Sequence, residues 1–425
     1  MKFSILTFGC KVNSYESEFM KEQLIKNGYE YIDDFKLGDI VIVNTCSVTN
    51  TADSKCRKMI RSVRRENDDC ILMVCGCSAE NHRENLNDLD IDILIGNKDK
   101  SNVHSLIEKF REDRVKYTKF YNSRKLPFED MRIKDFSLTR AFVKIQDGCN
   151  NYCAYCIIPY VRGSIRSKNF DDAVSEITDL VLKGHKEIVF TGINTGAYGK
   201  ETGTYDLTDL IREISKLDGL KRIRVSSIEI TEIDDKFINE MRVNKKICGH
   251  LHVSLQSGSE RILKLMNRKY TKDEYLEKVS KLRDARPDIN LTTDVIVGFP
   301  GETEEDFVEC AEYCKNVGFS KIHVFPFSKR EGTMAASMAG QLDNSVKKDR
   351  ARKLIEIDDG LQLEFNKRYL GRSVEVLVEE VVDGKSIGHT ENFVKVIIDG
   401  EFKTNEFVIV KVNEVFTEYV FATKM

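Results

Sequence analysis

Short apolar runs alternate with amphipathic segments along the first part of the chain. Strands that alternate with helices in this way are typical of a parallel sheet with crossover helices. We therefore predict an α/β domain of the Rossmann-like or flavodoxin-like type over residues 1–121. Its predicted strands are 3–8, 40–43, 71–74 and 91–95, and its clearest helical patterns are 16–27 and 51–67.

The alternation resumes after residues 122–138, which contain Pro127 and show no periodicity, as expected of a linker. Six further βα units predict a partial (β/α)6 barrel over residues 139–368. Its predicted strands are 141–145, 187–191, 223–227, 250–255, 290–297 and 321–325, and its predicted helices include 171–183, 206–216, 272–285 and 303–316.

The pattern changes again near the end of the chain. After a long helical segment at 344–369, apolar and polar residues alternate in short runs separated by Asp-Gly pairs. This pattern predicts a small antiparallel β-barrel over residues 369–425. Its predicted strands are 374–378, 393–398, 407–412 and 419–421.

Charge and hydropathy limit the partners. The 66 basic and 69 acidic residues give a net charge of -3, so RNA would have to bind a local basic patch. No apolar run approaches the roughly 18 residues of a membrane span. The opening residues 1–10 faintly resemble a lipoprotein signal, but their apolar stretch is short and Lys11 follows directly. We therefore expect no membrane association and a cytoplasmic location.

The chain contains twelve cysteines, more than the core of a cytosolic protein usually needs. In a reducing cytosol, so many thiols indicate metal binding or catalysis. Cys149, Cys153 and Cys156 form a Cys-x3-Cys-x2-Cys motif directly after the first barrel strand. Three thiolates on one loop suit a four-iron cluster that keeps one iron open. A zinc site is the alternative, and it would need a distant fourth ligand such as His185.

A second set of cysteines belongs to the first domain. Cys10, Cys46 and Cys77 each come just after a predicted strand, so a parallel sheet would gather them at its carboxyl edge. The alternative is three separate buried thiols, which are common in α/β cores. The spacing alone leaves the two interpretations open.

Several motifs together are similar, across nearly the whole chain, to the radical S-adenosylmethionine methylthiotransferases. These motifs are FGCKVNSYESE, NTCSVTNTADSKCRKMIR, GCSAE, QDGCNNYCAYCIIPYVRGSIRS, VFTGINTGAYG, SSIEI, HVSLQSGSERILKLMNRKYT and DVIVGFPGETEEDF. The resemblance implies two 4Fe-4S clusters, with Cys149, Cys153 and Cys156 holding one and Cys10, Cys46 and Cys77 an auxiliary one. It also implies that the C-terminal barrel is an RNA-binding TRAM domain. Cys75, two residues before Cys77, is the alternative third ligand.

The resemblance also implies a site for S-adenosylmethionine at the carboxyl ends of the barrel strands. Glycine-containing turns there are equally explained as ordinary strand-to-helix connections. Arg166 follows the cysteine loop and either holds an anionic group or pairs with a neighbouring acid. The expected cofactor-binding residues are Thr191, Gly192, Asn194, Ser254, Gln256, Gly298 and Arg166.

Within the family, the GCKVN, SSIE and HVFPFSKREGT motifs look like the branch that acts on tRNA N6-threonylcarbamoyladenosine next to the anticodon, at position 37. The implied reaction adds a 2-methylthio group by radical chemistry, using two molecules of S-adenosylmethionine and a reductase such as flavodoxin or ferredoxin. Glu229 is the candidate contact to the substrate or cofactor, with a salt bridge as its alternative role. Other substrates to consider are isopentenyladenosine in tRNA and a ribosomal-protein aspartate, and a non-catalytic metal-containing RNA-binding module is the rival outside enzymes.

A basic helix is the candidate site for the anticodon loop. On a helix, several of its cations share one face and could follow phosphates, although a solvated surface face is the alternative. The C-terminal barrel, with 6 basic and 10 acidic residues over 369–425, is unexpectedly acidic for RNA binding. Either Arg372, Lys385, Lys395 and Lys403 gather on one face, or the domain acts mostly by shape. The candidate RNA-binding residues of the helix are Lys55, Arg57, Lys58, Arg61, Arg64 and Arg65.

Overall fold

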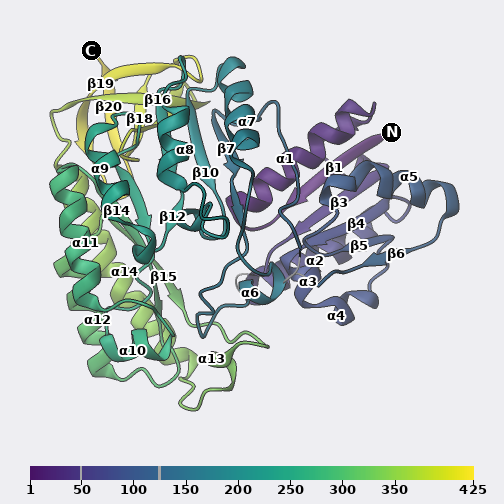
Figure 1. The fold of residues 1–425 in the computed structure, drawn as a ribbon, viewed down its shortest axis with the longest axis horizontal. Coiled ribbons are helices and arrows are strands. Elements are labelled where there is room, and N and C mark those ends of the chain that lie inside the picture. Colours follow the sequence, from purple (N-terminus) through teal and green to yellow (C-terminus); the bar gives the residue numbers. More distant parts are fainter. Residues whose placement is uncertain (48–49, 123–125) are drawn as a thin grey trace.

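The computed structural model describes residues 1–47, 50–122 and 126–425. Its elements form three parts that follow one another along the chain (Figure 1). An N-terminal α/β domain lies at the right, an open barrel at the centre and a small yellow barrel at the upper left. Among the described residues, no helix is both long and apolar enough to cross a bilayer.

The N-terminal domain is a six-stranded parallel sheet in the order β2-β1-β3-β4-β5-β6. Every residue of β3 and β4 is buried, because helices cover both faces of the sheet. This order and the parallel pairing confirm the flavodoxin-like prediction. The elements are β1 (Lys2–Thr7), α1 (Lys11–Lys26), β2 (Glu30–Tyr31), β3 (Ile40–Thr45), α2 (Asn50–Glu66), β4 (Ile71–Gly76), α3 (Cys77–Asn81), α4 (Arg83–Asn87), β5 (Ile93–Ile95), α5 (Val103–Asp113) and β6 (Tyr117–Lys119).

The segment that joins the two larger parts packs against both of them. Residues 126–138 form no helix or strand, yet Met131, Ile133 and Phe136 are buried in the barrel's hydrophobic core. The Tyr15 hydroxyl of α1 donates a 2.6 Å hydrogen bond to the carbonyl of Met131. The connection is therefore held in place; residues 123–125 of the predicted linker lie outside the described residues.

The central part is a parallel, open barrel, as predicted. Its strands form two sheets, β11-β10-β7 and β12-β13-β14-β15, with Ser226 between β11 and β12. The first and last strands do not pair, and α1 lies against β7 on this open side. The main elements are β7 (Arg140–Lys144), α7 (Phe170–Leu182), β10 (Glu187–Thr191), α8 (Leu207–Ile214), β11 (Arg222–Val225), β12 (Ser227–Ile228), α9 (Asp235–Val243), β13 (His250–Val253), α10 (Glu260–Leu265), α11 (Lys272–Ala285), β14 (Asn290–Val297), α12 (Glu304–Val317) and β15 (Lys321–Pro326).

Local sequence fixes where several of these helices begin. Thr271 and Glu274 form a capping box at α11, and Thr303 and Asp306 form one at α12. In each, two backbone N–H groups of the first turn find side-chain acceptors. Both helices start within one residue of the prediction. Shorter elements around the mouth are β8 (Gln146–Asp147), α6 (Ile158–Val161), β9 (Arg166–Ser167) and α13 (Met334–Ser337).

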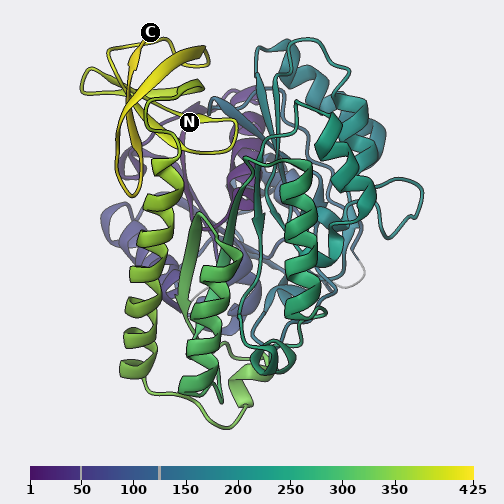
Figure 2. The same ribbon diagram turned by 90° about the vertical axis from the view of Figure 1, so that its left-hand side faces the viewer.

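A long helix, α14 (Asn344–Lys367), leads into the closed C-terminal barrel (Figure 2). Strand β17, with the sequence KSIGHT, is absent from the predicted strands because its apolar alternation is weak. One neighbouring pair, β18 and β20, is parallel, so the barrel is not wholly antiparallel. Its strands are β16 (Ser373–Val382), β17 (Lys385–Thr390), β18 (Lys395–Asp399), β19 (Phe407–Val415) and β20 (Val420–Lys424).

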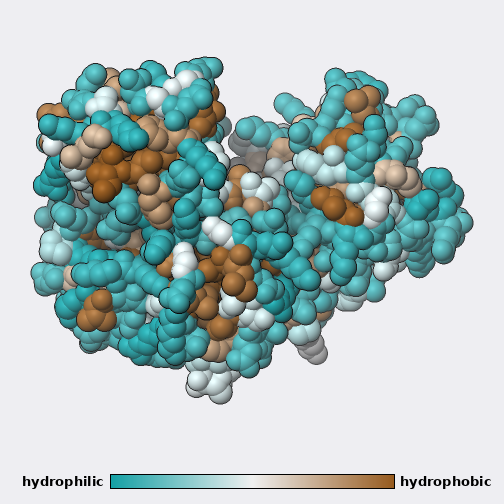
Figure 3. Space-filling model, turned by 90° about the horizontal axis from the view of Figure 1, so that it is seen from above, coloured by the Kyte–Doolittle hydropathy of each residue, from teal (hydrophilic) through white to brown (hydrophobic). Residues whose placement is uncertain are grey.

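The C-terminal barrel docks on the amino ends of the central strands through acidic side chains. Glu379 pairs with Arg140 at 3.0 Å, and Glu375 pairs with Arg222 at 3.3 Å. Glu391 accepts a 2.8 Å hydrogen bond from the Gly249 N–H. Part of the unexpected negative charge of this barrel is therefore used in docking. The surface seen from above is mostly hydrophilic, with a notch beside the N-terminal domain (Figure 3).

Candidate functional site

The three predicted cysteines of the N-terminal domain meet at the carboxyl edge of its sheet. Cys10 follows β1, Cys46 follows β3 and Cys77 follows β4. Gly9 has a φ of +113°, and a Cβ there would lie 2.8 Å from the Cys46 sulfur, so the turn requires glycine. Burial raises the pKa of Cys77, and the nearby charge of Cys10 acts in the same direction. The three side chains therefore surround one region.

Cys75 lies elsewhere. It is fully buried in the core cluster that contains Met73 and Ile93, whereas Cys77 packs with Ile157 and Val161 of the central barrel. Burial raises the pKa of Cys75 to about 12. Cys77, rather than Cys75, thus faces the domain junction.

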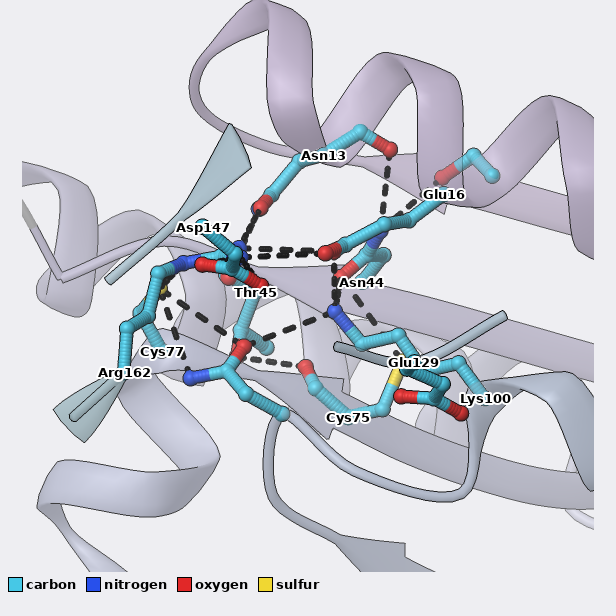
Figure 4. A network of polar contacts seen from close by, with 12 residues as sticks. Asn13, Glu16, Asn44, Thr45, Cys75, Cys77, Lys100, Glu129, Asp147 and Arg162 are labelled. Carbon is cyan, nitrogen blue, oxygen red and sulfur yellow. Dashed lines mark hydrogen bonds and ion pairs between the residues drawn. The ribbon is translucent and has the colours of Figure 1, made fainter. Parts of the chain in front are cut away.

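A buried network of charges holds Cys77 (Figure 4). The Nε of Arg162 donates to the Cys77 sulfur at 3.2 Å, and its Nη1 contacts Glu16 at 3.0 Å and Asp147 at 3.1 Å. Lys144 also bridges these two carboxylates, at 2.7 and 2.8 Å. The network joins α1 of the N-terminal domain to the loop after the barrel cysteines.

The network carries more positive than negative charge. Lys100 pairs with Glu16, and Arg166 contacts Asp147 at 3.1 Å, so four cations face two carboxylates. Burial disfavours the charged form of Glu16, but Arg162, Lys100 and Lys144 outweigh it and lower the pKa of the carboxyl. The carboxylates stay ionised, and the surplus positive charge lies beside the Cys77 sulfur. This surplus suits an anionic group bound by thiolates.

Cys149, Cys153 and Cys156 line one loop between β8 and α6. Gly148 precedes them with a φ of +71°, and a Cβ there would lie 2.0 Å from the Ser164 carbonyl oxygen. Burial raises the pKa of Cys149 to about 11 and that of Cys156 to about 12. The Nη1 of Arg268 donates to the Cys153 sulfur at 3.3 Å. An arginine thus donates to one sulfur in each set of three.

The donor chemistry of both sets fits iron–sulfur clusters. Soft thiolates are the usual ligands of such clusters, and hydrogen bonds to their sulfurs adjust the reduction potential. In the described part of the chain, no three His, Cys, Asp or Glu side chains converge closely enough to hold a single metal ion. His185, the fourth ligand of the zinc alternative, precedes β10 at the opposite end of the barrel and contacts Asp135 and the carbonyl of Thr139, both at 3.3 Å.

Two adjoining cavities open between the cysteine sets. One of about 200 Å³ is lined by Cys156, Gln256 and Arg330. The other, of about 820 Å³, fills the barrel lumen and reaches Gly9 and Lys11, on either side of Cys10. Asp294 and Phe325 line both cavities. Cys156 and the chain neighbours of Cys10 and Cys46, namely Gly9, Lys11 and Ser47, thus line two adjoining cavities.

The expected cofactor-binding residues separate into two groups. Thr191, Asn194, Ser254 and Gln256 are buried at strand ends around the mouth, and Gly192 contacts Gln146 there. The Asn194 Oδ1 has no hydrogen-bond partner among the described residues, as expected of a group that awaits a ligand.

Gly298 and Arg166 have structural partners instead. A Cβ at Gly298 would lie 2.5 Å from Lys347 of α14, and its N–H is bonded to Glu302. Arg166 donates to the carbonyl of Arg162 at 2.6 Å and contacts Asp147. Close packing explains the glycine, and pairing with an acid explains the arginine.

Glu229 lies beside the barrel cysteines. It forms an ion pair with Arg268, which in turn donates to the Cys153 sulfur. Glu229, Cys153 and Asn151 border one small pocket. The salt bridge that was the alternative role is therefore present, and it positions the arginine against the cysteine loop.

The basic helix α2 presents four cations to solvent. Lys55, Lys58, Arg61 and Arg65 are exposed, and Arg57 is half-buried. Arg64 points toward the domain, where it pairs with Asp92 and donates to the Cys70 carbonyl at 2.7 Å. The predicted stripe therefore lacks Arg64.

Sequence reasoning missed several charged residues. Arg162 and Arg268 contact cysteine sulfurs, and Arg224 lines the lumen. The Arg222-Ile-Arg224-Val pattern carried a usable signal, because charged residues at every second position of a buried strand share one face and need polar partners there.

Three family models match consecutive parts of the chain. The Uncharacterized protein family UPF0004 matches residues 2–96, the Radical SAM superfamily residues 143–314 and the TRAM domain residues 367–425.

Curated relatives match nearly the full length. A threonylcarbamoyladenosine tRNA methylthiotransferase, MtaB, of Bacillus subtilis is 40% identical and covers 93% of this chain and 89% of its own. The MtaB of Thermotoga maritima is 38% identical over 99% and 96% of the two chains. A tRNA-2-methylthio-N(6)-dimethylallyladenosine synthase of Acetivibrio thermocellus is 38% identical over 89% and 81%.

A solved structure supports the fold. The radical S-adenosylmethionine methyltransferase TsrM of Kitasatospora setae superimposes with a TM-score of 0.57, over 79% of this chain and 76% of its own, at 14% identity. Because the identity is so low, the superposition shows that the two proteins share a fold and carries no conclusion about activity.

Proposed function

Because the chain belongs to the radical S-adenosylmethionine methylthiotransferases, we propose that it converts N6-threonylcarbamoyladenosine next to the tRNA anticodon to its 2-methylthio derivative. One observation of the structure carries the proposal: Cys156 lines the smaller of two adjoining cavities together with Ser47, the neighbour of Cys46, and the larger cavity reaches Gly9 and Lys11, on either side of Cys10. A transfer that joins a carbon radical to a sulfur needs both reaction centres around one substrate. When bound, the two 4Fe-4S clusters and S-adenosylmethionine supply the radical and sulfur chemistry.

The chain's own residues orient these groups. Cys149, Cys153 and Cys156 would hold the cluster of the barrel, with Arg268 donating to one sulfur. Cys10, Cys46 and Cys77 would hold the auxiliary cluster, with Arg162 as its donor. Gln256 lines the smaller cavity with Cys156, and the Oδ1 of the buried Asn194 has no hydrogen-bond partner among the described residues, so both would contact S-adenosylmethionine.

The domain junction fixes the distance between the two sets of cysteines. Arg330 of the central part pairs with Asp53 of α2 and donates to the carbonyl of Ser47, next to Cys46. All of these groups are buried, and water is excluded from them. Together with the Arg162 network, they hold the N-terminal domain against the barrel mouth.

Two partners complete the proposal. The TRAM domain and α2 would bind the tRNA, and a flavodoxin-type or ferredoxin-type reductase would supply electrons in the cytoplasm. The second candidate substrate is N6-dimethylallyladenosine, which the 38% identity to the Acetivibrio thermocellus synthase favours.

The test is a nucleoside assay. Anaerobically reconstituted protein is incubated with S-adenosylmethionine, a reductant and tRNA from a strain that lacks methylthiolated adenosines. We expect mass spectrometry of the digest to show the 2-methylthio derivative of threonylcarbamoyladenosine. Product on dimethylallyladenosine alone would establish the second candidate, and a product on neither would reject both.

A further inference from the structure

The 820 Å³ lumen cavity has a floor that the reaction centres do not use. It extends from Lys11 past β7, β11, β13 and β14 to His389 and Phe393 of the C-terminal barrel. Its upper end adjoins the smaller cavity at Asp294 and Phe325. A substrate held between the cysteine sets would therefore project into it.

The lining of this cavity contains more basic than acidic residues, although Arg140, Arg224 and Lys321 pair with carboxylates outside it. It includes five basic residues but only two acidic ones, Asp294 and Glu418. Lys11 and Lys395 make no ion pair or side-chain hydrogen bond with any residue in the described ranges. The basic residues are Lys11, Arg140, Arg224, Lys321 and Lys395.

Arg224 is the informative member because it is only 3% exposed. Its Nε donates to Glu187 at 2.7 Å, and its Nη2 donates to the Glu391 carbonyl at 3.1 Å. Its Nη1 is buried and has no partner within the part of the chain that the structure describes. A buried charged donor without a partner is costly, and an anionic ligand would remove that cost.

His250 supplies a second unpartnered group at the same place. Its Nε2 contacts the Thr292 hydroxyl at 3.2 Å, whereas its Nδ1 has no partner in the described residues. Burial, reinforced by the charge of Arg224, lowers the pKa of His250, so the ring is neutral at pH 7. A neutral ring has one N–H to donate, and it adds no competing charge.

The chemistry of the substrate identifies the anion. The N6 substituent of threonylcarbamoyladenosine ends in a carboxylate, whereas a dimethylallyl group is an uncharged hydrocarbon. The reacting C2 and the N6 group lie on the same edge of adenine, separated by N1. An adenine held with C2 beside Cys10 and its N6 group directed into the lumen would place the N6 substituent within reach of the next residue, Lys11, which lines that cavity.

We propose that Lys11 and Arg224 bind the carboxylate of the N6 substituent and thereby select threonylcarbamoyladenosine over dimethylallyladenosine. The inference rests on the proposed function, since it names how that site recognises its substrate. It also assigns a role to the floor of the lumen, where the C-terminal barrel closes the cavity with His389 and Phe393.

The test compares anticodon stem-loop RNAs that differ only at the modified adenine. One carries threonylcarbamoyladenosine, one carries its neutral carboxamide and one carries dimethylallyladenosine. Affinities are measured by fluorescence anisotropy with the full, reconstituted chain, and turnover is measured by mass spectrometry. We expect the acid to bind about tenfold more tightly than the carboxamide, as a charge-assisted contact predicts.

Two variants test the residues separately. Lys11→Gln should lower the affinity for the acid about tenfold and leave that for the carboxamide unchanged. Arg224→Lys keeps a positive charge beside Glu187 but has no Nη1 to donate to the carboxylate. It should therefore also remove the preference for the acid RNA over the carboxamide RNA. Lys26→Gln, at the exposed far end of α1, removes the same charge and should change neither affinity.

Other outcomes would overturn the inference. Equal binding of acid and carboxamide by the unmodified chain would mean that the cations serve RNA phosphates instead. A full preference in both variants would exclude these residues, while methylthiolation of the acid RNA would still support the proposed function. Failure of the proposed function itself would appear as no turnover of the acid RNA by the unmodified chain. Because Lys11 follows Cys10 directly, the iron content of Lys11→Gln is measured as a control. Arg224 lies far in sequence from any predicted cysteine ligand, so Arg224→Lys gives an independent result.

Discussion

The N-terminal cysteines come from three strand ends between residues 10 and 77, whereas the barrel cysteines share one stretch from 149 to 156. In the first set, Cys46 and Cys77 are 4% exposed and Cys10 is exposed, while Cys149, Cys153 and Cys156 are all partly exposed. Sheet topology and a buried charge network assemble the first set. A single loop assembles the second. The first site therefore depends on the folded domain junction, and the second depends mainly on local sequence.

Loss of the barrel cysteines should have the largest effect. Replacing Cys149, Cys153 and Cys156 by Ala should abolish both cleavage of S-adenosylmethionine and transfer of the methylthio group. Iron should fall from about eight to about four per chain, since each cluster holds four. Chemical iron analysis and detection of 5′-deoxyadenosine measure these effects. A colourless wild-type protein that contains zinc after anaerobic reconstitution would reject both sites.

The paired variants Cys77→Ala and Cys75→Ala test the assembly of the N-terminal site. Cys77→Ala should reduce iron to about four per chain and stop sulfur transfer, but S-adenosylmethionine cleavage should continue. Cys75→Ala changes a buried thiol on the core side and should keep about eight irons. If Cys77→Ala still transferred sulfur, or if Cys75→Ala alone lost sulfur transfer, Cys75 rather than Cys77 would be the third ligand of the N-terminal site.

Arg162→Gln tests whether the network supports the N-terminal site. The change removes the donor to the Cys77 sulfur, while Glu16 and Asp147 keep the cations of Lys100, Lys144 and Arg166. Losing a hydrogen bond that involves a charged group costs about 1.5–3 kcal/mol. We expect a lower free energy of unfolding by denaturant and a weaker or lost auxiliary cluster, while the cluster held by Cys149, Cys153 and Cys156 remains. Arg132→Gln, whose ion pair with Asp179 is partly exposed, is the control and should cost no more than about 1 kcal/mol. If the two variants lost the same free energy of unfolding, the buried Arg162 network would contribute no more to stability than a partly exposed ion pair.

The same contrast explains what the sequence could and could not predict. Period-2 and helical patterns predicted the parallel sheet, the open barrel and the cysteine loop, because these follow from local sequence. They missed β17, whose alternation is weak, and the parallel pairing of β18 with β20. Arg162 and Arg268 were missed because their sulfur contacts join residues 85 and 115 positions apart. The acidity of the C-terminal barrel had no explanation in the sequence, because it serves contacts between distant segments: Glu375, Glu379 and Glu391 contact the central barrel.

RNA binding gives the smallest expected effect, and it extends the comparison because the basic helix α2 follows Cys46. Lys58→Gln together with Arg61→Gln should weaken tRNA binding and reduce the salt dependence of the affinity by about one unit of slope per lost phosphate contact. Arg64→Gln removes a cation of the same helix, but this cation pairs with Asp92 within the domain. It should lower stability and leave the salt dependence unchanged. If Arg64→Gln reduced the slope as much as the exposed pair, the exposed face of α2 would not be the surface that follows the phosphates.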